Sequence, residues 1–131
     1  MLGELERQHG FVVCDLEAGV GTLLRLQPGQ VDVVLVLAEP SAKSLETARR
    51  ALEIAAPVAR VVVIANKVGG KADLDTIRAA LGEHEFVVVP DDPAVAEADR
   101  EGVAPIDAAP AAPAVQAIVA LAGRLQTSTL V

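Results

Sequence analysis

The stretch VDVVLVLAEPSAKSLETARRALEIAAPVARVVVIA, residues 31–65, decides the fold. It opens and closes with aliphatic runs, Val31–Ala38 and Val61–Ala65, that are rich in β-branched residues. Continuous aliphatic runs are typical of strands that are buried on both faces of a parallel sheet. Between the runs, Ser41 is a candidate N-cap, and apolar residues then recur at helical spacing until Pro57. The stretch predicts a strand–helix–strand unit.

Two more aliphatic runs, Phe11–Cys14 and Phe86–Val89, predict a strand before this unit and a strand after it. A second helix is predicted from near Asp73 to a stop at Gly82, and a last helix from Pro113 to Leu125. The inward stripe of that last helix is predicted to be Val115, Ile118, Val119 and Ala122.

Strands that alternate with helices predict an α/β fold, in which a mainly parallel sheet of about four strands is flanked by helices as a three-layer sandwich. The chain has 131 residues, which is the length of one domain, and we expect residues 1–131 to form a single domain. Hydrophobic residues make up 52% of the chain and aromatic residues only 2%, so the core must consist of valine, alanine, leucine and isoleucine.

The charge and the cysteine count exclude several classes of protein. The formal net charge is −7, which argues against the positive patch that nucleic acids require, and two phenylalanines make no base-stacking platform. The single cysteine, Cys14, excludes an internal disulfide, and we expect it to be a small core residue. Because we see neither a leader nor an apolar run of membrane-spanning length, we expect a cytoplasmic protein without membrane contact.

Ligands of parallel sheets bind beyond the carboxyl ends of the strands, so polar residues at those ends are candidate site residues. Asp15 ends the first run, and Gly19 follows four residues later. A carboxylate there can hold Mg²⁺ through water, and a glycine lets a backbone amide approach a terminal phosphate. The structural alternative is a turn aspartate before a loop.

Asn66 and Lys67 follow the third run. An asparagine amide can pair with the edge of adenine, and a lysine stem can cover the face of a base. Pro90-Asp91-Asp92 follows the fourth run and could line the same base pocket. For Asp92, capping of a helix that begins near Pro93 is the favoured interpretation.

Four segments, taken in order, resemble the MinD/ParA-like branch of P-loop ATPases, the CobQ/CobB/MinD/ParA group. They are VVCDLEAGVGTLLR, VDVVLVLAEPSAKSLETARRALEIA, VVVIANKV and VVVPDDPAVAEADREG. The D-x-E-A-G pattern in the first segment is most similar to the CooC-type ATPases of metallocentre maturation. The resemblance covers nearly the whole chain.

This resemblance implies a role for each matching residue. Asp15 would be the acidic residue of the Walker B strand, associated with Mg²⁺, and Gly19 would be the switch glycine that senses the γ-phosphate of ATP. Asn66 would recognise adenine, while Pro90 and Asp92 would form the P-x-D element beside the base.

The phosphate loop of the family, G-x-x-x-x-G-K-[ST], has no counterpart in these 131 residues. The stretch Gly19-Val20-Gly21-Thr22 lacks its lysine and fits the switch segment better. We therefore expect a truncated domain that does not hydrolyse ATP alone, with a homodimer or an upstream polypeptide that supplies the loop as possible partners. In the family the phosphate-loop strand separates the strands that match Phe11–Cys14 and Val31–Ala38. Without it, either these strands pair directly or their edges stay open.

Two other functions remain compatible with the sequence. One is a non-enzymatic interaction module that keeps the α/β scaffold. The other is a receiver-like domain, with Asp15 as phospho-acceptor and Lys67 as the partner cation.

Overall fold

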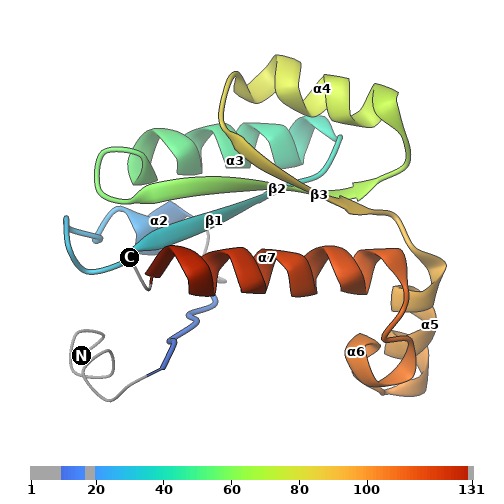
Figure 1. Ribbon diagram of the computed structural model, residues 1–131. Coiled ribbons are helices and arrows are strands. Elements are labelled where there is room, and N and C mark those ends of the chain that lie inside the picture. The colour runs from blue at the N-terminus through green and yellow to red at the C-terminus, as the bar shows by residue number, and fades with distance from the viewer. Residues whose placement is uncertain (1–9, 17–19, 130–131) are drawn as a thin grey trace.

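A computed structural model describes residues 10–16 and 20–129 of the chain, and its strands and helices are shown in Figure 1. The strands are β1 (Val33–Ala38), β2 (Arg60–Val68) and β3 (Glu85–Pro90). The helices are α2 (Val20–Leu23), α3 (Ala42–Ala55), α4 (Lys71–Leu81), α5 (Pro93–Glu101), α6 (Pro105–Ala108) and α7 (Pro113–Thr129).

The three strands form a parallel sheet in the order β1-β2-β3. Leu35 lies opposite Val62, and Ile64 lies opposite both Leu37 and Val87. Helices α3 and α4 connect the strands across one face of the sheet, and α7 lies on the other face (Figure 1). The predicted α/β fold with a parallel sheet between helices is confirmed.

The core on the α3 and α4 side consists of small and β-branched residues. Ala38, Ala55 and Ala65 are fully buried there, as are Val63 and Ile77. Alanine side chains let α3 approach the sheet closely, which explains how a core almost without aromatic rings closes without large gaps. Helix α3 begins as the sequence predicts, because Ser41 Oγ accepts a hydrogen bond from the Ser44 amide at 3.3 Å.

The second core lies under α7, where Val62 and Ile64 of β2 and Val87 and Val89 of β3 are buried. The predicted start of α7 is correct, but of its predicted stripe only Val115 is buried, and Ala122 is exposed. Ala114 and Leu121 are buried, with Ala117 and Leu125 packed beside them, whereas Ile118 and Val119 are 55% and 45% exposed. Two alanines and two leucines of α7 cover the sheet, and a count of large apolar side chains overlooks the alanines.

The predicted strand at Phe11–Cys14 does not form. Residues 11–16 are irregular and exposed, with Val13 at 91% and Cys14 outside the core. A strand needs a neighbour to pair its backbone groups, and β1 does not pair with this segment. The sheet therefore has three strands rather than four, and the outer edge of β1 is open within the described part of the chain.

No helix among the described residues is both long and apolar enough to cross a membrane.

An ion-pair network connects the starts of β2 and β3 to α7. Glu85 at the start of β3 binds Arg60 of β2 through two hydrogen bonds, of 2.7 and 3.1 Å. It also accepts a hydrogen bond of 2.8 Å from Arg124 of α7. The hydrogen bond from Arg60 lowers the pKa of the Glu85 carboxyl below its usual value, and the same bond raises the pKa of Arg60.

We predict that Glu85→Gln lowers the melting temperature at pH 7 by a few degrees. Because the pKa of Glu85 is depressed in the folded state, its contribution to stability is complete above the ordinary glutamate pKa of about 4.3 and disappears as the pH falls through the lower folded value. The difference in stability between wild type and variant should therefore shrink under strong acid. Thermal melts from pH 3 to pH 7 measure it, with Glu83→Gln as control, since Glu83 is exposed and forms no ion pair with the described residues. Equal effects of the two substitutions would contradict the network.

Candidate functional site

The parallel sheet brings the ends of its three strands to one edge. Glu39 follows β1, Asn66 and Lys67 lie near the end of β2, and Pro90 ends β3. Val68 lies opposite Pro90, and the Asp91 amide donates a hydrogen bond of 3.0 Å to the Val68 carbonyl. Four of the predicted site residues, Asn66, Lys67, Pro90 and Asp92, thus belong to this one edge.

Asn66 is the group at this edge that is available to a ligand. It is half-buried, and it follows the last regular pair between β2 and β3, Ala65 with Val88. Its side-chain amide makes no hydrogen bond with any described residue, and no atom of it is both buried and unsatisfied. An amide that is held by a strand and left open to solvent can donate and accept at once, as the edge of a purine requires.

Lys67 adopts a backbone conformation that is rare for its residue type. Its φ is +55°, and it is the only residue besides glycine with a positive φ in the described part of the chain. The register of β2 against β3 shifts between Ala65 and Val68, so Lys67 lies in a bulge. Bulges and left-handed residues turn side chains away from their regular directions and recur at functional sites. This feature is an independent reason to place a site at the end of β2.

The Lys67 ammonium lies 3.2 Å from a carboxylate oxygen of Glu39 and is largely exposed. The backbone amide of Glu39 in turn donates to Ser44 Oγ at 2.9 Å. The ion pair therefore joins the ends of β1 and β2, next to Asn66 in the sequence. The sequence prediction did not foresee this pair, although a glutamate and a lysine at the ends of neighbouring parallel strands are a signal for it.

Asp92 has a structural function, as the capping interpretation predicts. Its Oδ1 accepts a hydrogen bond of 3.0 Å from the Ala94 amide and caps α5. Its Oδ2 accepts one of 3.1 Å from the Ala114 amide, at the start of α7. Both carboxylate oxygens are thus engaged with helix starts, and Asp92 anchors α7 to the end of β3.

Asp15 and Gly19 are the two residues predicted for phosphate and metal chemistry. Asp15 is exposed in an irregular segment, so no strand end places it at this edge, and Gly19 lies outside the described residues. No group of three or more His, Cys, Asp and Glu side chains suited to a metal exists among the described residues.

Asp73 is a residue whose contribution the sequence prediction missed. Its Oδ2 accepts a hydrogen bond of 2.8 Å from the Gly69 amide and closes the turn between β2 and α4. A Cβ on Gly69 would lie only 3.0 Å from that oxygen, so a larger residue would displace the carboxylate. A Gly-Gly turn that is followed by an aspartate in the first turn of a helix is the signal that could have revealed it.

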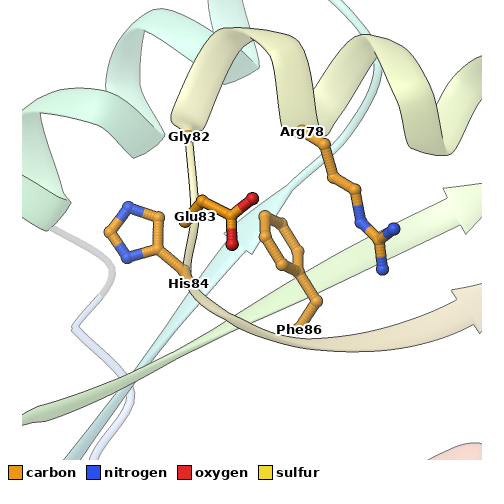
Figure 2. Close-up of a pocket in the computed structure, with 5 residues that line it drawn as sticks. All are labelled: Arg78, Gly82, Glu83, His84 and Phe86. Atoms are coloured by element: carbon orange, nitrogen blue, oxygen red, sulfur yellow. The ribbon is translucent and has the colours of Figure 1, made fainter.

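A separate hollow of about 300 Å³ lies at the start of β3, the opposite end of that strand from Pro90. Figure 2 shows its lining by Arg78, Gly82, Glu83, His84 and Phe86. The Arg78 guanidinium lies 5.4 Å from the centre of the Phe86 ring, and His84 meets the same ring edge-to-face at 6.4 Å. Because Phe86 already contacts both side chains, the hollow is a product of the packing at the end of α4. It contains none of the predicted site residues.

Comparison with known proteins gives one informative similarity. No protein-family model matches the chain. The chain is similar to an uncharacterized ATP-binding protein of Methanocaldococcus jannaschii, with 31% identity over 109 residues. The match covers 79% of this chain but only 43% of that protein, so the chain spans less than half the length of this relative.

We predict that Asp92→Ala lowers the free energy of unfolding by about 1–3 kcal/mol, because it removes a helix cap and leaves two half-buried amides unpaired. Urea denaturation measures the change. Asp91→Ala is the matched control, since the Asp91 side chain is exposed and only its backbone amide is bonded. A loss in the control as large as that in Asp92→Ala would contradict the anchoring role of Asp92.

The backbone of Lys67 yields a second prediction. Lys67→Gly and Lys67→Ala both delete the ion pair with Glu39, so they differ only in the backbone. At a φ of +55° the glycine variant should be the more stable by about 1 kcal/mol. Arg50, exposed within α3, is the control position, where the order should reverse by about 1 kcal/mol. Denaturation of the four variants measures both differences, and the same order at both positions would disprove the left-handed conformation.

Proposed function

We propose that this chain is the base-recognising part of an ATP-binding α/β protein of the MinD/ParA-like kind. The observation that carries the proposal is the open side-chain amide of Asn66, which a bulged strand end holds beside the fixed ammonium of Lys67. Asn66 pairs with the edge of adenine, and the stem of Lys67 lies against the face of the base. Pro90 closes the pocket on the β3 side, and Asp92 shapes it by anchoring α5 and α7.

Two observations from outside the site support this function. The similar protein of Methanocaldococcus jannaschii is named for ATP binding, and the match includes 79% of this chain. The order of the sequence segments supports the same family and, through D-x-E-A-G, its CooC-type members. In that family Asp15 and Gly19 serve Mg²⁺ and the γ-phosphate, and we assign them these roles in the complete site. We also assign the protein to the cytoplasm.

The phosphates are the incomplete part of the site. The 131 residues contain no G-x-x-x-x-G-K-[ST] loop, and charge-assisted hydrogen bonds to phosphate contribute roughly 1.5–3 kcal/mol each. The loss of three such bonds weakens binding by about 10³-fold or more. The chain alone therefore binds ATP weakly and does not hydrolyse it, and a further polypeptide segment supplies the phosphate loop.

The proposal predicts a rise in melting temperature when the chain is mixed with Mg·ATP. A dissociation constant of about 1 mM gives a stabilisation of about 1 kcal/mol at about 5 mM ATP, which corresponds to a rise of roughly 3–5 °C. Asn66→Ala should abolish the rise. GTP should give a smaller one, because guanine presents a carbonyl where adenine presents an amino group.

The control variant is Arg78→Ala, in the hollow at the start of β3, which should keep the rise with ATP even if its own stability changes. If ATP raises the melting temperature equally in Asn66→Ala and in wild type, Asn66 does not contact the base. No rise in wild type would favour the second candidate function.

That second function is a non-enzymatic interaction module, either a homodimer or a subunit that completes a larger ATPase. The observation in its favour is that Asp92 and Lys67 are both engaged in contacts within the chain, while the outer edge of β1 is open within the described part of the chain. If the protein is stable and no nucleotide changes its melting temperature, the result supports the interaction module and contradicts the ATP site.

A further inference from the structure

The two outer edges of the sheet differ in how they are protected. β3 begins with Glu85, which is held in ion pairs, and ends with Pro90, which cannot donate to another strand. Charged residues and proline are the usual means by which proteins keep edge strands from pairing. β1 has the sequence Val-Val-Leu-Val-Leu-Ala, without a charge or a proline. Within the described part of the chain, the outer edge of β1 is thus an unprotected template for another strand.

One face of β1 also carries exposed apolar side chains. Leu35 and Leu37 are 37% and 59% exposed, whereas their neighbours across the ladder in β2, Val62 and Ile64, are 1% and 5% exposed. On the opposite face of β1, Val34, Val36 and Ala38 are all buried. Helix α7 packs on β2 and β3, and its contacts leave the two leucines uncovered. β1 therefore has the composition of an interior strand and the position of an edge strand.

We infer that the outer edge of β1 binds an extended aliphatic segment of a different polypeptide, which adds a strand to the sheet. The backbone N–H and C=O groups that β2 does not use supply the hydrogen bonds, as in other cases of strand addition. The added strand and the residues that follow it cover Leu35 and Leu37. This inference does not depend on nucleotide binding.

Charge argues against a second copy of this chain as the occupant. Asp32 and Glu39 stand at the two ends of β1. The Glu39 carboxylate is already paired with the Lys67 ammonium, whereas Asp32 forms no ion pair with the described residues, so its charge is uncompensated among them. Each copy also carries a net charge of −7. The segment that fits best is therefore aliphatic in its centre and basic at the end that meets Asp32.

The chain's own aliphatic segment, residues 11–16, does not occupy this edge. It is irregular, and Val13 is 91% exposed. The relative from Methanocaldococcus jannaschii has more than half of its length outside the match.

The test uses the ¹⁵N-labelled chain and a capped peptide, Lys-Val-Ile-Val-Ile-Val-Lys. We expect its addition to shift the backbone amide resonances of Val33–Ala38 and to protect them from hydrogen exchange. Leu35→Lys should weaken binding roughly tenfold, because it places a charge on the strand and repels the basic ends of the peptide. Val88→Lys is the matched control, since Val88 lies in β3 and is 36% exposed against 37% for Leu35. It should leave binding unchanged.

A second peptide with proline at its centre, Lys-Val-Ile-Pro-Ile-Val-Lys, separates strand pairing from hydrophobic adhesion, and it should not bind. Equal binding of both peptides, shifts confined to β3, or no shifts at all would overturn the inference. Shifts at Val33–Ala38 that grow with protein concentration in the absence of peptide would identify a second copy as the occupant and would overturn it as well.

Discussion

The parallel pairing of β2 with a strand on each side is the constraint on which the rest of the structure depends. Because β2 bonds to β1 and β3 in one direction, each connection must cross the sheet, and α3 and α4 provide the crossings. The same pairing buries Val62–Ala65 on both faces and creates the two cores. It also brings the carboxyl ends of all three strands to one edge, and this alone makes Asn66, Lys67 and Pro90 neighbours.

The parts of the fold that local sequence determines were predictable. The runs at β1, β2 and β3, the cap at Ser41 and the stop at Gly82 each depend on a few consecutive residues, and each is found in the structure. Phe11–Cys14 has the same composition as those strands but stays irregular, because a strand requires a neighbour and composition does not reveal whether one is present. In α7 the inward face is set by how closely the helix approaches the sheet, so Ala114 and Ala117 are favoured over Ile118.

The residues of the candidate site also differ in whether local sequence or strand pairing determines their positions. Asp92 as a cap could be predicted, because an aspartate before Pro-Ala is a local signal. The bulge and the positive φ of Lys67 could not, because they follow from the register between β2 and β3. Asp15 shows the opposite case. Its predicted role required a strand that ends at the common edge of the sheet. Because residues 11–16 form no strand, the position of Asp15 in the sequence does not predict its position in the fold.

Glu39 connects the edge of β1 that is open within the described part of the chain with the proposed base site. This residue follows the last residue of β1, and its carboxylate holds the ammonium of Lys67 beside Asn66. A strand that added to β1 in parallel would have its carboxyl end next to Glu39, so the loop that follows it would reach the edge where the half-buried Asn66 lies. If that loop carried backbone amides toward a phosphate, the strand would complete both the sheet and the nucleotide site in one step. An antiparallel strand would point its loop to the other end of the sheet, toward Asp32, and could complete only the fold. The direction of the added strand therefore decides whether association and nucleotide binding are coupled.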